Sequence, residues 1–125
     1  MKDDTQEESP VKYMMLIAGS EEAWDRLGPE ESQQMMERIG GWWGEHHAAG
    51  RIIEGHQLQS VATATTVRRD GDGQATVTDG PFMEGKEVVG GYGILDVADL
   101  DEAIAIASSW PAPDVLEIRP IVERD

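Results

Sequence analysis

The chain has 125 residues, no cysteine and a net charge of -15 at pH 7. This length fits one domain with a core of its own, and the absence of cysteine excludes disulfides, thiolate metal sites and cysteine nucleophiles. The acidic balance disfavours nucleic acids and anionic membranes, because binding phosphate groups requires clustered Lys and Arg. We therefore expect neither a nucleic acid nor a membrane as a partner.

The first ten residues are acidic and end at Pro10, which predicts a disordered tail over residues 1–10. This segment is too acidic for a signal peptide. No apolar run approaches the roughly 20 residues that a membrane-spanning helix requires. These features predict a cytoplasmic protein with one folded domain over residues 11–123.

Residues 11–18 are typical of a β-strand that is apolar on both faces. One face would carry Tyr13, Met15 and Ile17, and the other Met14, Leu16 and Ala18. Because one layer of helices covers only one face of a sheet, the other face requires a second layer, from this chain or from a partner.

Two helices are predicted after this strand. Ser20 is placed to cap a short helix that runs to Asp25, and Pro29 opens a long helix that reaches about Ala49 before Gly50. The apolar face of the long helix would hold Met35, Ile39, Trp42 and His46. Its Gly40-Gly41 pair is unfavourable for a helix, and we expect a close approach to the sheet as the reason.

The second half of the chain alternates strands, turns and one more helix. Strands are predicted over residues 51–58, 62–69, 74–78, 88–96 and 115–122, and the second and third of these form a hairpin around an Asp-Gly-Asp-Gly turn. Glycines at 90, 91 and 93 indicate a bulge or a close contact in their strand. Asp99 and Glu102 predict a capped helix that ends before Pro111.

Without the hairpin, the order of elements is βαββαβ. It predicts an α+β fold of the ferredoxin-like, split βαββαβ type, with the hairpin inserted. Such a sheet carries helices on one face only. Because the first strand is apolar on both faces, we expect a two-fold homodimer that packs sheet against sheet.

The densest group of ionisable residues lies at a charged corner, residues 77–87. Asp79 precedes Gly-Pro, where its carboxylate either forms an Asx turn or serves as a general base or ligand acceptor. Lys86 lies between Glu84 and Glu87. These three residues form either a surface ion-pair set or a group that orients a polar substrate.

Other candidate residues lie on the strands. Glu54 and His56 share one strand face, which permits a carboxylate–imidazole pair for proton transfer or a structural contact. Tyr13 and Tyr92 either present hydroxyl groups to a ligand or belong to the core. The histidines have no HxxxH or HExxH spacing, so we predict no metal and no cofactor.

Several segments in order carry a family resemblance. They are residues 12–17, 48–50, 62–67, the Val-Thr-Asp-Gly-Pro-Phe-Met-Glu-Gly-Lys-Glu run at 77–87, and residues 90–92, 101–103 and 117–120. Together they resemble the DGPF branch of the YCII-related domain family, over about residues 11 to 122. The resemblance implies a dimeric α/β barrel.

The resemblance implies less about function than about the fold. Enzymes of the wider family, such as dehydrochlorinases of chlorinated hydroquinones, use a His–Asp pair. The corresponding positions here hold Ile39 and Trp110, so neither residue is matched. Members of the DGPF branch are associated with extracytoplasmic-function sigma factors, which implies a regulatory role.

Two functions are therefore predicted. The first is a small-molecule-binding dimer, as a lyase-like or hydrolytic enzyme or as a binding protein, with its pocket between sheet and helices near the charged corner. Asp79 would act as base or acceptor, Glu84 and Lys86 would orient the ligand, and His56 would shuttle protons. The alternative is a non-enzymatic module whose acidic surface grips a sigma factor.

Overall fold

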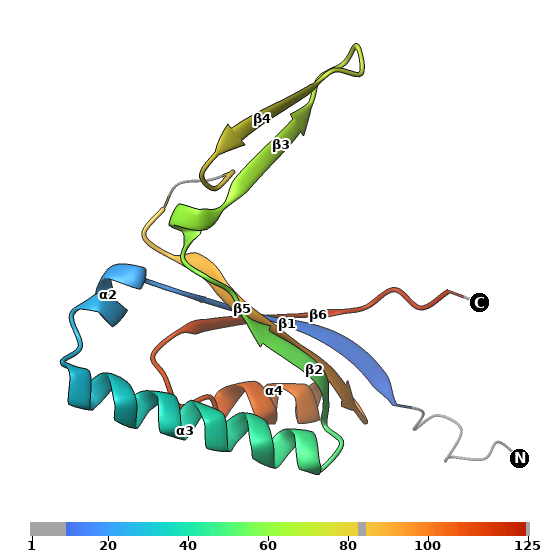
Figure 1. Ribbon diagram of the computed structural model, residues 1–125. Helices are drawn as coiled ribbons and strands as arrows, with labels where there is room; N and C mark the ends of the chain where they lie inside the picture. Colours follow the sequence, from blue (N-terminus) through green and yellow to red (C-terminus); the bar gives the residue numbers. More distant parts are fainter. Residues whose placement is uncertain (1–9, 83–84, 125) are drawn as a thin grey trace, which may run out of the picture.

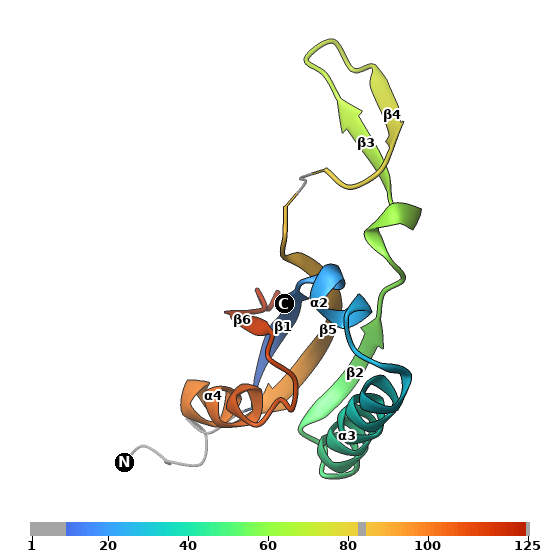
Figure 2. The same cartoon turned by 90° about the vertical axis from the view of Figure 1, so that its left-hand side faces the viewer.

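The computed structural model describes residues 10–82 and 85–124. A four-stranded antiparallel sheet has the order β2-β5-β1-β6, formed by Ile52–Gln57, Val88–Val97, Val11–Gly19 and Val115–Pro120. Helices α3 (Pro29–Ala48) and α4 (Leu100–Ser108) lie side by side on one face of this sheet (Figures 1 and 2). The predicted α+β class is confirmed, and the strand order is compatible with a ferredoxin-like arrangement.

The two faces of β1 differ as its alternation predicted. Tyr13, Met15 and Ile17 point toward the helices and are buried, with Met15 fully inaccessible. Leu16 and its neighbours on the opposite face are half-buried, although no layer of the described chain covers them. The core therefore lies between the sheet and the two helices.

The helix ends follow the predicted capping residues. The Ser20 hydroxyl accepts a hydrogen bond from the Ala23 N–H at 3.1 Å and starts α2 (Glu21–Asp25). The Asp99 carboxylate accepts one from the Glu102 N–H at 2.9 Å at the start of α4. Gly50 follows α3 with a φ of 78°, a left-handed conformation that glycine adopts without steric cost.

Glycines of the sheet make room for Trp43 of α3. A Cβ atom on Gly55 of β2 would collide with the Trp43 ring, and one on Gly93 of β5 would lie 3.0 Å from it. The close approach expected at Gly40 and Gly41 is wrong, because a Cβ at either position would meet no atom within 4 Å. The helix approaches the sheet through a tryptophan ring that rests on strand glycines.

Two bulges alter the register of the sheet. The β1–β5 pairing shifts between Ile17 and Ala18, so that Gly90 is the extra residue of β5, in agreement with the predicted bulge. A second shift places Ile53 outside the β2–β5 pairing. Strict alternation along residues 51–58 would put Ile52 on the face of Glu54 and His56, but the bulge at Ile53 turns Ile52 into the core.

The predicted hairpin forms a separate arm. Strands β3 (Thr65–Arg69) and β4 (Ala75–Asp79) pair only with each other, and the arm projects away from the body (Figure 1). Residues 62–64 were predicted as strand, but a 3-10 turn, η1 (Val61–Thr63), replaces its start. The cause is local: the Ser60 hydroxyl accepts a hydrogen bond from the Ala62 N–H and caps this turn.

The outer face of α4 is more exposed than its pattern predicted. Ala103 and Ile106 are buried in the core. Leu100 and Ile104, which helical spacing places on the face of Ala103, remain 49% and 47% exposed. α4 has only nine residues and covers a small part of the sheet near its edge (Figure 2). Part of its apolar surface therefore has nothing to pack against.

Candidate functional site: a cavity between the sheet and α3

A cavity of about 850 Å³ lies between the helix-facing side of the sheet and α3. Its floor is formed by Ile17, Ile52 and the backbone at Gly55 and Gly91, and α2 borders it through Trp24. This volume is within the range of pockets that hold drug-sized molecules. The cavity is partly open to solvent, and we refer to it as the groove.

One face of α3 forms the long wall of this cavity. The wall consists of Ser32, Met36, Ile39, Gly40, Trp43, Gly44 and His47, which recur at spacings of three and four residues. At Gly40 and Gly44 a Cβ would meet no atom within 4 Å. The two glycines therefore widen the groove where larger side chains would fill it.

Three tryptophan rings stand around this space. Trp43 and Trp110 lie with ring centroids 6.0 Å apart at an interplanar angle of 80°, and Trp24 approaches from α2. Trp42 meets Trp43 and Trp110 edge to face at 5.2 and 5.0 Å but belongs to the buried core. Edge-to-face pairs of this geometry stabilise the packing of the rings by about 0.5–1.5 kcal/mol beyond the area that they bury.

Asp114 brings a carboxylate to the same cavity. Its Oδ2 accepts a hydrogen bond from the Trp110 indole N–H at 2.9 Å. Its Oδ1 lies directly beside Gly19, where any Cβ would collide with it. Asp114 is thereby held between β1 and the Trp110 ring, at a position where a ligand donor can reach it.

Glu21 closes the end of the cavity near the arm. Its Oε1 accepts a hydrogen bond from the Ser60 hydroxyl at 2.9 Å, and its Oε2 accepts one from the Val61 N–H at 3.0 Å. These bonds join α2 to the segment that leads into β3. The position of α2, and of Trp24 on it, therefore depends on this carboxylate.

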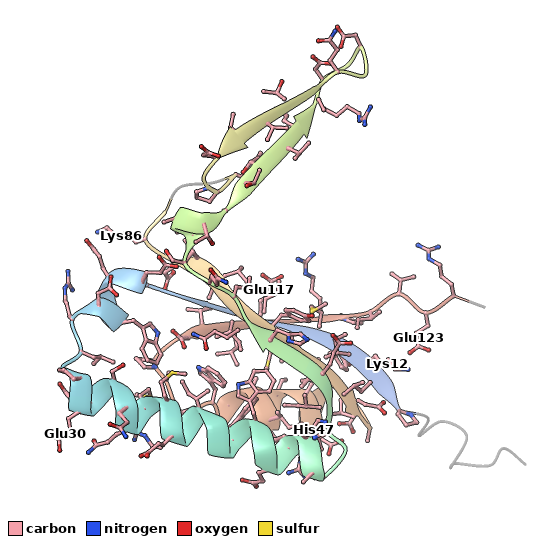
Figure 3. All side chains as sticks on the ribbon, in the orientation of Figure 1. Lys12, Glu30, His47, Lys86, Glu117 and Glu123 are labelled. Carbon is pink, nitrogen blue, oxygen red and sulfur yellow. The ribbon has the colours of Figure 1, made fainter. Side chains whose placement is uncertain are left out.

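The predicted charged corner lies outside this cavity. Asp79, Lys86 and Glu87 are exposed and are not among its lining residues, and Lys86 lies at the foot of the arm (Figure 3). Glu84 falls outside the described residues. Among the described residues, the Asp79 carboxylate makes no hydrogen bond, so the Asx turn finds no support there.

Backbone and threonine contacts hold the corner instead. The Thr66 hydroxyl donates to the Gly80 carbonyl at 2.6 Å, and the Gly80 N–H donates to the Ala64 carbonyl at 2.8 Å. Gly80 has a φ of 101°, which favours glycine at this turn. The Asp-Gly-Pro-Phe motif thus shapes the base of the arm.

The structure brings His56 and Tyr92 together on the uncovered face of the sheet. The Tyr92 hydroxyl donates to Glu54 Oε2 at 3.2 Å, and His56 Nε2 lies 3.8 Å from the same oxygen. The pKa of Tyr92 is raised, first by partial desolvation and then by Glu54, so its hydroxyl remains a donor. Glu54 and His56 are exposed and Tyr92 is half-buried, and all three lie on a different sheet from Asp79. His56 is also among the residues that line the cavity.

Tyr13 and His46 belong to the core. Tyr13 is 7% exposed and lines neither this cavity nor a smaller one between α4 and β6. His46 Nδ1 accepts a hydrogen bond from Arg51 Nε at 2.8 Å. The pKa of His46 is lowered, chiefly by burial and further by the Arg51 guanidinium, so its neutral form is favoured.

The cavity contains residues that the sequence did not single out as functional. Trp24, Gly44 and Asp114 are the main ones. The spacing of Gly40 and Gly44, four residues apart on α3, is a signal in the sequence that could have indicated an open helix face. Nowhere in residues 10–82 and 85–124 do three or more His, Asp or Glu side chains gather to hold a metal ion. No helix of the described chain is long and apolar enough to cross a membrane.

Comparison with known proteins identifies relatives over nearly the whole chain. The family model for the YCII-related domain matches residues 11–125. An uncharacterised protein of Rhizobium meliloti (strain 1021) is 29% identical over 113 residues, which are 87% of this chain and 90% of that protein. The similarity therefore extends across the sheet, both helices and the arm.

Proposed function

Since the chain belongs to the YCII-related domain family, we propose that it is a small-molecule-binding protein whose ligand lies in the groove between the sheet and α3. The observation that carries this proposal is the cavity of about 850 Å³ bordered by Trp24, Trp43 and Trp110. Aromatic walls with a few polar groups are typical of ligand pockets. The groove suits a flat, largely apolar molecule with one polar group.

The polar groups of the groove are concentrated at its ends. Ser20, Glu21, Asp25 and Asp114 lie at the end where β1 leads into α2, since Asp114 Oδ1 is beside Gly19. His47 lies near the C-terminal end of α3 (Figure 3). A ligand with its apolar part against the tryptophans would direct its polar part to one of these ends. This arrangement supports binding and orientation. The side-chain cluster of Glu54, His56 and Tyr92 lies on the other face of the sheet, although His56 also borders the groove.

The experiment that tests this proposal fills the groove from α3. An added Cβ at Gly40 would meet no atom within 4 Å, and Gly40 lines the groove, so Gly40→Leu would place a side chain there. Leucine is also the better helix former by somewhat less than 1 kcal/mol. We expect this variant to fold as stably as the parent and to lose at least tenfold in affinity for the neutral fluorescent probe N-phenyl-1-naphthylamine.

Gly41→Leu is the matched control. Gly41 is the next residue of α3, is also surrounded by open space, and does not line the groove. We expect its affinity for the probe to equal that of the parent within twofold. Equal binding of the probe by both leucine variants would show that the groove is not the binding site and would refute the proposal.

A homodimer is part of the same proposal. The sheet face opposite the helices carries Met14, Leu16 and Ile94, which are only half-buried within one chain. A second copy packed on this face would cover them. Leu16→Glu is expected to yield monomers in sedimentation velocity, whereas Leu100→Glu, at an exposed position of α4, would leave the dimer intact. A monomeric parent at micromolar concentration would contradict the dimer.

A further inference from the structure

The ionisable groups that line the groove are unequal in sign. Its described lining includes three carboxylates, Glu21, Asp25 and Asp114, and two histidines, His47 and His56, but neither lysine nor arginine. Lys12 and Lys86 lie elsewhere (Figure 3). The Arg26 guanidinium, although next to Asp25 in sequence, is exposed and lies 3.8 Å from Glu22. A bound anion would thus meet carboxylates without a lining Lys or Arg to pair with.

The three carboxylates differ in their availability. Both oxygens of Glu21 already accept hydrogen bonds from the segment that leads into the arm. Asp25 is exposed at the end of α2. Asp114 is half-buried, and its Oδ2 is fixed by the Trp110 indole N–H. Asp114 is therefore the carboxylate with a defined position inside the groove, and the other two add negative potential at its rim.

The aromatic walls favour the same sign of charge. The face of an indole ring is electron-rich, and tryptophan is the best aromatic partner for a cation within about 6 Å of the ring. Trp24, Trp43 and Trp110 all border the groove. Low-dielectric walls concentrate the field of nearby charges, and the chain as a whole carries -15. The rings and the carboxylates thus both favour a positively charged ligand.

We propose that the ligand of this groove is an organic cation: an amine or quaternary ammonium group attached to an apolar body. The cationic group lies near Asp114 and the Trp110 ring, and the apolar body lies along Met36 and Trp43. This assignment rests on the proposed binding function and adds the chemical class of the ligand. A neutral molecule of equal shape fits the walls but gains nothing from the carboxylates.

The test compares three probes that share a phenol and differ in charge. They are 4-hydroxybenzyl-trimethylammonium, its neutral isostere 4-neopentylphenol, and the anion 4-hydroxyphenylacetate, each titrated by calorimetry and tryptophan fluorescence. We expect the cation to bind at least tenfold more tightly than the isostere, and the anion to bind more weakly than both. The affinity for the cation is expected to fall as the salt concentration rises.

Asp114→Asn gives the residue-level test. Its amide oxygen can still accept the hydrogen bond of the Trp110 indole, so the ring remains in place. We expect a five- to tenfold loss of affinity for the cation and less than twofold for the neutral isostere. Asp101→Asn is the matched control, since Asp101 lies in the first turn of α4, outside the groove, and its replacement changes the net charge equally.

The outcomes separate the two proposals. If the neutral isostere binds as tightly as the cation, and Gly40→Leu abolishes both, the groove is a binding site but the cationic ligand is refuted. An equal loss of cation affinity in Asp101→Asn and Asp114→Asn would also refute it, since net charge alone would then act. If Gly40→Leu changes the binding of no probe, the groove itself fails as the site, and both proposals fall.

Discussion

The groove and the arm of this protein are opposite in character. The arm carries the Asp-Gly-Pro-Phe motif and several charged side chains, yet nearly all of its residues are exposed and its strands pair only with each other. The groove also has ionisable groups in its lining, but three tryptophan rings border it and the sheet forms its floor. Enclosure favours a ligand site more than a concentration of charged residues in the sequence does, because burial lets a few polar contacts select a ligand.

The largest expected effect is a loss of stability, and it tests whether the groove region is packed more tightly than the arm. Gly55→Ala places a methyl group against the Trp43 ring, and we expect a loss of about 2 kcal/mol in the free energy of unfolding because the core is overpacked. Urea denaturation followed by tryptophan fluorescence measures it. Gly71→Ala is the matched change in the arm, where the added methyl meets open space, and should leave stability unchanged. Similar losses in both variants would show that the arm is packed like the body.

A smaller effect is expected at the junction of the two regions. Glu21→Gln replaces the carboxylate whose two oxygens accept hydrogen bonds from Ser60 and Val61. We expect a loss of about 1 kcal/mol in stability and a two- to fivefold loss of probe affinity, because α2 and Trp24 become less fixed. Glu22→Gln, on the same helix, serves as the control. Full retention of probe affinity would mean that α2 does not shape the groove.

The third prediction concerns how the stability of the fold depends on pH. Burial and Arg51 lower the pKa of His46 below its unfolded value of about 6.5, so the unfolded chain binds the proton more readily. Stability due to neutral His46 is present above pH 6.5 and is lost as the pH falls through the folded pKa, by about 1.4 kcal/mol per unit of difference. Urea denaturation between pH 7.5 and 5 measures this slope.

Two glutamine variants isolate the effect of His46. His46→Gln should flatten the decline in stability with acid, while His47→Gln, at the exposed neighbouring position, should preserve it. An identical pH dependence in the parent and in His46→Gln would contradict the assignment. Carboxylates elsewhere in the chain would then account for the loss.

The smallest expected effect lies at the corner of the arm. Because Asp79 is exposed and outside the groove lining, Asp79→Asn should change the affinity for the cationic or neutral probe by less than twofold and the melting temperature by less than about 2 °C. A loss of binding in a folded Asp79→Asn protein would restore the sequence-based view of Asp79 as a ligand acceptor and would join the arm to the site.

The fold was largely predictable from local signals. The alternation of residues 11–18, the caps at Ser20 and Asp99, the Asp-Gly-Asp-Gly turn and the glycines of β5 each determine a short-range conformation, and the structure contains all of them. The register was less predictable. One extra residue at Ile53 exchanged the faces of β2, since a bulge depends on the partner strand as much as on its own sequence.

Sequence alone was enough for the order of elements, the core-facing sides of β1 and α3, and the family. The tertiary structure was needed to show which side chains line the same groove. Asp114, Trp24 and Gly40 are distant in sequence, and α3 brings them around one groove as it crosses the sheet. Asp79 and His56, both prominent in sequence, are separated because the arm leaves the body. Local propensity acts over a few residues, whereas a binding site requires elements that meet only when the core forms.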